Sequence, residues 1–201
     1  MKTLHLLPDD SQSAHFWPGW LDVGFVLSAP GTFEASRLKP AFGVTGAHLD
    51  LALTRHLVPA LPGVFPSAHR YDYRITNAYA SPLSHARGDG RTEADDADIR
   101  IQTNADRVRD ELAGCRLVVL CGAKAALLKY QLPDLAVVVA GHTSTSGLNS
   151  RWQNTRQRER EHDQSWDAKS GDERTAGRIA LWAHDVETQV RALVNGGGLQ
   201  P

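Results

Sequence analysis

Cysteine is nearly absent from this chain. Its 201 residues include two cysteines, Cys115 and Cys121, which lie beside and at the end of one apolar run. Two thiols are too few for an iron–sulfur cluster or for a zinc site with four cysteine ligands. We therefore expect both thiols to be buried and reduced.

Long hydrophobic runs and an excess of one charge are also missing. The apolar stretches 117–121 and 135–140 are far shorter than the ~20 residues of a membrane-spanning helix. Lysine and arginine number 22 against 23 acidic residues, and the net charge of -1 excludes a polycation that coats nucleic acid indiscriminately. Residues 1–10 do not resemble a secretory signal. We expect a cytoplasmic protein without membrane contact, in which any nucleic-acid contact is local.

Cofactor and metal motifs are absent as well. Gly31 lacks the companion glycines of a dinucleotide-binding G-x-G-x-x-G turn, and no Walker lysine pattern occurs. The nine histidines form no H-E-x-x-H or comparable pair, and no cysteine lies near enough in sequence to complete a metal site. The sequence therefore predicts neither a cofactor nor a metal.

What the chain does contain is an alternation of apolar runs and amphipathic segments. With 41% apolar residues, 201 residues suit a single domain with one core. Segments rich in strand formers occur at 23–27, 71–78, 117–121 and 136–140. Their alternation with helical segments is typical of an α/β fold. We predict a three-layer α/β/α sandwich around a mainly parallel sheet of roughly four strands.

Helical spacing and polar composition mark the segments between these strands. Apolar stripes predict helices from Leu49 to Pro59, from Ile101 to Gly114, and from Ile179 to the glycines after Asn195, with a further helix opening at 122–128. Two stretches, 84–98 and 151–171, contain few apolar residues and are expected to be exposed polar insertions.

Three loops follow predicted strands, at the sheet edge where open parallel sheets bind their ligands. They cover residues 28–34, 77–82 and 142–149, with Phe42 shortly after the first. Helix N-termini at this edge direct backbone amides toward a ligand. These loops are the expected place for chemistry.

Five segments, taken in order, resemble the thermophilic-type family of the uracil-DNA glycosylase superfamily. Residues 26–34 resemble its Gly-Glu-Ala-Pro-Gly loop with a trailing acidic residue, and 40–46 are similar to its Pro-Phe-Val-Gly-x-x-Gly stretch. Residues 75–78 resemble its Ile-Thr-Asn-Val strand end, and 118–126 its apolar strand followed by Gly-Ala-x-Ala-Ala. Residues 141–144 are similar to its His-Pro-Ser loop, so the resemblance spans about 23–149.

Three departures limit this resemblance. The four cluster-binding cysteines of the family are absent, so no iron–sulfur cluster is expected. Thr143 replaces the proline after the histidine. Ala29 stands where other members of the superfamily place an Asp or Asn that orients water, although the thermophilic-type family also has alanine there. The resemblance therefore leaves the substrate base open.

The resemblance implies a pocket for a base swung out of DNA. It assigns Ala29, Pro30 and Gly31 to the pocket, Phe42 to stacking on the base, and Asn77 to reading the base edge with its amide. From the residues alone, Phe42 is equally a core aromatic, and an asparagine at a strand end is usually a turn former.

Two residues are candidates for catalysis. Cleavage leaves negative charge on the departing base, and His142 is placed to donate a hydrogen bond to it. Glu34 is the candidate for positioning water or stabilising the cationic sugar. The structural alternatives are a loop histidine with satisfied hydrogen bonds and an exposed glutamate.

Further residues of the last loop are candidates for DNA contact. Ser144 and Thr145 offer hydroxyls and amides to phosphates, while Leu148 or Arg151 would fill the gap that the extruded base leaves in the duplex.

These observations predict a monomeric, metal-independent DNA glycosylase. It would hydrolyse the N-glycosidic bond of uracil or a modified pyrimidine, in base excision repair or in defence against phage DNA with modified bases. Two alternatives stay open: a catalytically inactive DNA-binding module with the same fold, and an unrelated α/β nucleotide-binding protein.

Overall fold

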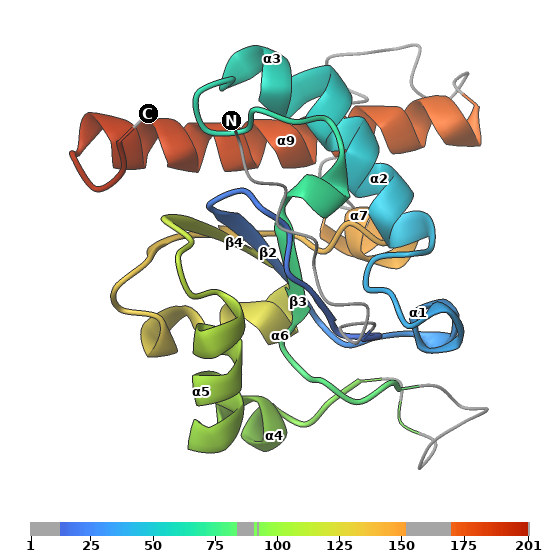
Figure 1. Ribbon diagram of the computed structural model, residues 1–201. Coiled ribbons are helices and arrows are strands. Elements are labelled where there is room, and N and C mark those ends of the chain that lie inside the picture. The colour runs from blue at the N-terminus through green and yellow to red at the C-terminus, as the bar shows by residue number, and fades with distance from the viewer. Residues whose placement is uncertain (1–12, 84–90, 92, 152–169, 201) are drawn as a thin grey trace, which may run out of the picture.

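A five-stranded sheet forms the centre of the protein (Figure 1). The computed structural model describes residues 13–83, 91, 93–151 and 170–200, apart from the side chain at 151. The strand order is β1-β3-β2-β4-β5, in which β1 is antiparallel to β3 and the other pairs are parallel. The strands are β1 (Phe16–Trp17), β2 (Val23–Leu27), β3 (Arg74–Asn77), β4 (Leu117–Cys121) and β5 (Ala136–Ala140).

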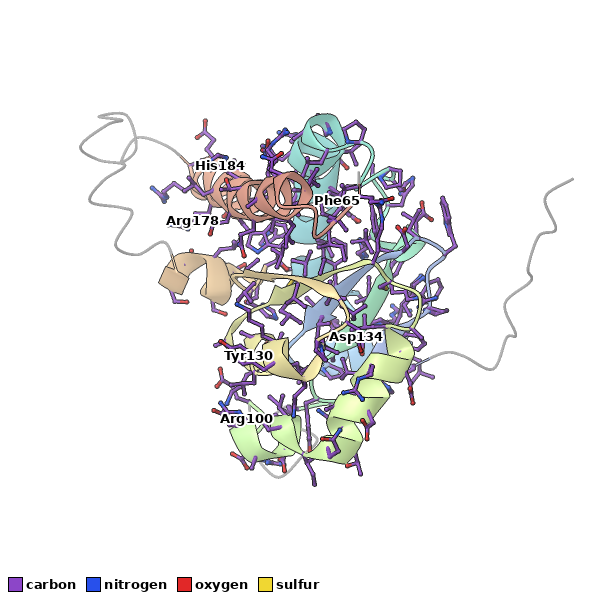
Figure 2. The ribbon with its side chains drawn as sticks, turned by 90° about the vertical axis from the view of Figure 1, so that its left-hand side faces the viewer. Phe65, Arg100, Tyr130, Asp134, Arg178 and His184 are labelled. Carbon is purple, nitrogen blue, oxygen red and sulfur yellow. The ribbon has the colours of Figure 1, made fainter. Side chains whose placement is uncertain are left out.

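Helices cover both faces of this sheet, which confirms the predicted α/β/α sandwich (Figures 1 and 2). One face packs against α2 (Val44–Ala52), the π-helical turn η2 (Leu53–Leu57) and α9 (Gly171–Asn195). The other packs against α5 (Gln102–Glu111) and α6 (Ala123–Ala126). The remaining helical elements are α1 (Thr32–Arg37), α3 (Val58–Ala60), η3 (Arg70–Asp72), α4 (Asp96–Arg100), η4 (Lys129–Gln131) and α7 (Thr145–Arg151).

The two central strands are buried on both sides. Every residue of β2 and of β4 is buried, and successive side chains alternate between the two cores. A parallel strand covered on both faces has a nearly continuous apolar sequence, which is why these runs could be identified beforehand. Cys115 and Cys121 are buried and unpaired, as predicted, and burial raises their pKa values to about 11 and about 12.

Several predicted boundaries differ from the structure. The antiparallel strand β1 was missed because two residues carry no alternation pattern, and β3 is shorter than the predicted 71–78. The short helices α1 and α7 begin within the predicted loops 28–34 and 142–149 and extend beyond them. The helix predicted from Leu49 begins earlier, at Val44. Among the described residues, no helix combines the length and apolar character needed to cross a membrane.

The predicted polar insertions lie largely outside the described residues, which omit 84–90, 92 and 152–169. The end of the first insertion is structured and not wholly exposed, because Ala94 is buried and α4 begins at Asp96. The second ends where Ser170 caps α9 by accepting a hydrogen bond from the Glu173 amide.

A partly buried carboxylate attaches the segment before β1 to the rest of the fold. The Oε1 atom of Glu111 on α5 lies 3.0 Å from Nε2 of His15, while Thr76 and Arg107 donate to Oε2 over 2.5 and 2.6 Å. Burial acts to raise the pKa of Glu111, but the hydrogen bonds from His15 and Thr76 and the charge of Arg107 outweigh it and lower the pKa. The ionised carboxylate therefore stabilises the folded state.

We predict that Glu111→Ala lowers the free energy of unfolding by about 3 kcal/mol at neutral pH, because its partners lose their acceptor. Thr76→Val removes one hydrogen bond and should cost about 1 kcal/mol. Since the folded-state pKa of Glu111 is lowered, the wild-type advantage should be complete above the ordinary value of 4.5 and decline as the pH falls through the folded pKa. Urea unfolding at several pH values measures it, and an advantage that persists in acid would contradict the assignment.

Candidate functional site

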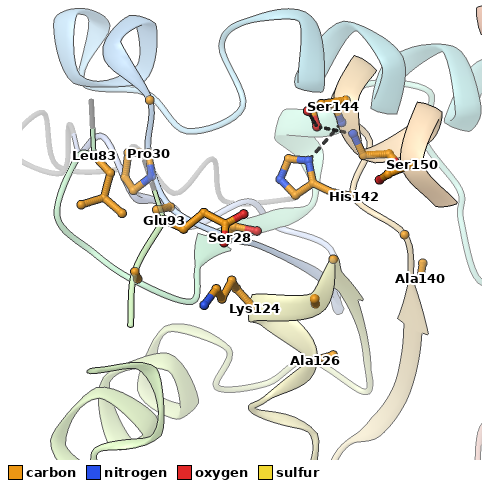
Figure 3. Close-up of a pocket in the computed structure, with 18 of the residues that line it drawn as sticks. Ser28, Pro30, Leu83, Glu93, Lys124, Ala126, Ala140, His142, Ser144 and Ser150 are labelled. Atoms are coloured by element: carbon orange, nitrogen blue, oxygen red, sulfur yellow. Dashed lines mark hydrogen bonds between the residues drawn. The ribbon is translucent and has the colours of Figure 1, made fainter. Parts of the chain in front are cut away.

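A pocket of about 800 Å³ lies where β2, β4 and β5 end (Figure 3). In the sheet, β3 lies next to β2 on one side and β4 lies next to it on the other. The connection after β2 leads to β3, whereas the connection after β4 leads in the opposite direction, to β5. The two connections therefore diverge between β2 and β4. Such a switch point is where open α/β sheets bind ligands. The lining side chains with polar groups are Ser28, Glu93, Lys124, His142, Ser144, Ser146 and Ser150.

His142 lies two residues after the end of β5, and its ring lines the pocket (Figure 3). The backbone N–H of Ser144 donates to Nδ1 of His142 over 3.0 Å. An N–H group cannot accept a hydrogen bond, so Nδ1 is unprotonated and the neutral ring carries its proton on Nε2. Burial lowers the pKa of His142, which favours this neutral form. The imidazole is therefore a neutral hydrogen-bond donor at the pocket.

The loop that carries His142 is fixed by helices packed beside it. The indole N–H of Trp182 on α9 donates to the carbonyl of Gly141 over 2.7 Å. His48 on α2 binds the carbonyl of Thr143 through Nδ1 over 2.7 Å, and the Thr143 hydroxyl donates to the carbonyl of Thr45 over 3.2 Å. Thr143, which stands in the place of the family's proline, thus anchors the loop to α2.

Two glycines make room for the His142 side chain. Gly122 has φ of +102°, and a Cβ atom on it would lie 3.1 Å from the Cβ of His142. A Cβ atom on Gly147 would lie 2.7 Å from both the Cβ and the carbonyl oxygen of His142. A larger residue at either position would displace the imidazole or its backbone.

The opposite side of the pocket contains the first loop that resembles the glycosylase family. Ala29, Pro30 and Gly31 line the pocket, and their contact with a base stays a prediction. Glu34 does not: its Oε2 accepts a hydrogen bond from the Gly31 amide over 3.1 Å and caps α1. The structure therefore gives Glu34 a positioning role for this loop in place of the predicted contact with water or sugar.

Asn77 and Phe42 do not line this pocket either. Asn77 is buried at the end of β3, and its amide donates to the backbone carbonyl of His15 over 3.4 Å. Phe42 is 40% exposed, so the alternative of a core aromatic is wrong, and the guanidinium carbon of Arg37 lies 5.5 Å from its ring centroid. Their base-reading and base-stacking roles stay predictions without support from the pocket geometry.

The candidates for DNA contact have different positions. Ser144 lines the pocket and accepts a hydrogen bond from the Gly147 amide, while Thr145 is exposed at the start of α7. Leu148 is 1% exposed and belongs to the core, so its predicted insertion into a duplex is wrong. The side chain of Arg151 lies outside the described part of the structure.

Glu93 and Lys124 line the pocket but were not singled out from the sequence. Glu93 lies in a stretch whose composition predicted a solvated insertion, and Lys124 lies in α6. Lys124 donates to Asp96 over 2.7 Å, and this hydrogen bond raises the pKa of the lysine. That Glu93 and Lys124 face the pocket becomes visible only in the folded structure, where α4 and α6 pack near this edge of the sheet.

In the part of the chain that the structure describes, no three His, Cys, Asp or Glu side chains are grouped so as to hold a metal ion. No protein-family model matches the chain, and no curated protein matches it. The argument for function therefore depends on the pocket and on the resemblance of its segments.

We predict that Gly147→Ala displaces His142 and lowers the free energy of unfolding by about 1–3 kcal/mol through crowding. Gly171→Ala is the matched control, because a Cβ atom there meets no atom within 4 Å. Histidine ring NMR signals and urea unfolding measure both effects. Unchanged His142 signals in Gly147→Ala would show that the loop has more room than the structure gives it.

The lowered pKa of His142 predicts a pH dependence of stability. The unfolded chain protonates near the ordinary value of 6.5, whereas the folded chain takes up this proton at lower pH. Stability should therefore decrease as the pH falls from above 6.5 through the folded pKa. The difference in unfolding free energy between the wild type and His142→Gln should shrink over this range. A difference independent of pH would indicate that the histidine is not buried against protonation.

Proposed function

We propose that the protein is a DNA glycosylase that hydrolyses the N-glycosidic bond of uracil or a modified pyrimidine flipped out of DNA. One observation carries the proposal: residues 29–31 and 141–144 are far apart in the chain, both resemble the glycosylase family, and both border one pocket. The pocket lies at the ligand-binding edge of the sheet and contains a neutral histidine donor.

The chemistry of bond cleavage matches this donor. When the bond between the sugar carbon and the base nitrogen breaks, its electron pair stays on the base, and negative charge spreads to the carbonyl oxygens of the base. The Nε2–H group of His142 would donate to such an oxygen where this charge develops. A water oxygen then bonds to the sugar carbon and releases a proton, and the base leaves after taking up a proton.

A neutral imidazole suits this role better than a cation. A neutral ring can be buried without the cost of desolvating a full charge. Because its orientation is fixed, it needs no rearrangement when negative charge appears on the base. The hydrogen bonds from Trp182, His48 and Thr143 hold the loop in that orientation. The fixed loop supports a donor that acts mainly in the transition state.

The test is base release from oligonucleotides that contain uracil, mismatched uracil, hypoxanthine or 5-substituted pyrimidines, detected by alkaline cleavage of the abasic product. We predict release of at least one pyrimidine, and a decrease of about 10²- to 10³-fold in single-turnover rate for His142→Ala. Binding to an uncleavable analogue should change little. The control is His184→Ala, at an exposed position on α9.

Two outcomes would contradict the proposal. Selective binding of a modified base without release would favour an inactive DNA-binding module. Equal losses of affinity and rate in His142→Ala would make His142 a ground-state contact and remove its catalytic assignment.

A further inference from the structure

The pocket has space beyond that of one pyrimidine ring. Its volume of about 800 Å³ falls in the upper part of the ~300–1,000 Å³ range of pockets that hold drug-sized ligands. A base that contacts His142 therefore leaves room on the side of the pocket formed by the segment before α4.

Glu93 occupies that side of the pocket. Figure 3 shows its carboxylate pointing into the cavity from the wall opposite His142. Asp96 binds the ammonium group of Lys124, the nearby cation on this wall. Glu93 is exposed and has no hydrogen bond or ion pair with another described residue, although its negative charge contributes to the raised pKa of Lys124. Its carboxylate is therefore available to a ligand.

An ionised carboxylate accepts hydrogen bonds and donates none. A ligand group that binds the Glu93 carboxylate directly must therefore carry a donor, such as a hydroxyl, an amine or an ammonium group. Uracil has carbonyl oxygens on its ring and no donor substituent on its carbon edge, so it gives Glu93 nothing to bind there. A ring substituent that ends in a donor would fill the free space and satisfy the carboxylate.

We propose that Glu93 selects pyrimidines that carry a hydroxyl- or amino-bearing substituent on the ring, and that such a base is preferred over uracil. This inference rests on the proposed glycosylase function and names its substrate class. His142 donates a hydrogen bond to the carbonyl oxygen of the base on which charge develops, and Glu93 binds the substituent on the other side of the ring. Glu93 is thus a specificity residue that contacts the substrate away from the bond that breaks.

The experiment measures single-turnover release of 5-aminomethyluracil, 5-hydroxymethyluracil, 5-carboxyuracil and uracil from otherwise identical oligonucleotides. Substituents also alter the leaving-group ability of the base, so the informative quantity is the ratio of variant to wild-type rate for each base. Glu93→Gln keeps the shape of the side chain and removes its charge. Its ratio should fall about 10- to 100-fold for 5-aminomethyluracil, less for 5-hydroxymethyluracil, and little for uracil.

Two further variants sharpen the test. Glu93→Lys should raise the release of 5-carboxyuracil relative to 5-aminomethyluracil, because it reverses the charge that meets the substituent. Asp98→Asn removes a charge from the neighbouring helix α4 at a position that does not line the pocket, and its ratios should be equal for all four bases. Thermal unfolding checks that each variant is folded.

The outcomes separate this inference from the proposed function. Equal decreases for every base in Glu93→Gln would make Glu93 part of the bond-breaking chemistry and overturn the specificity role. If the ratio of variant to wild-type rate is unchanged for every base, the specificity role is overturned as well. Release of uracil by the wild type would in that case still support the glycosylase function. Failure of the wild type to release any of the four bases would overturn both.

Discussion

Burial of β2 and β4 on both faces is the constraint from which the arrangement of this protein follows. Strands with apolar side chains on both sides require a helical layer above and below, and parallel strands require long connections that supply those layers. The connections after β2 and β4 then leave in opposite directions along the sheet. The gap between them becomes the pocket, so its position is a consequence of how the core is packed.

The histidine loop shows how this packing reaches the site. Its backbone oxygens accept hydrogen bonds from α2 and α9, two helices that also form the core on one face of the sheet. Displacement of the loop would leave the Trp182 indole N–H buried without an acceptor, which is costly in an apolar interior. The same burial that orients the loop keeps His142 neutral. Orientation and protonation state of the imidazole therefore have a common origin in the core.

The sequence predicted the parts of the fold that depend on local pattern. The bounds of β2, β4 and β5 match the apolar runs, because these strands are buried and bounded by turn residues. In the site, Ala29, Pro30, Gly31 and His142 could be singled out from the sequence because they lie in loops that follow strands, and these residues line the pocket. Ser144, which was predicted to contact phosphates, also lines it. Contacts between distant segments were not predictable: Leu148 is in the core, and Glu93 faces the pocket only after the chain has folded. Glu34 caps α1 through a local contact with Gly31, which the sequence analysis did not identify.

The wall of the pocket that holds His142 and the wall that holds Glu93 are held in place by different contacts. The side that holds His142 is bound to the core by hydrogen bonds to helices, so changes there disturb packing as well as chemistry. The side that holds Glu93 comes from a connection before α4, where Glu93 is exposed although its neighbour Ala94 is buried in the core. Connections of this kind tolerate substitution better than the elements that they join. A fold with this division can keep the His142 donor fixed on one wall of the pocket while residues on the opposite wall change, because the two walls are stabilised by different contacts.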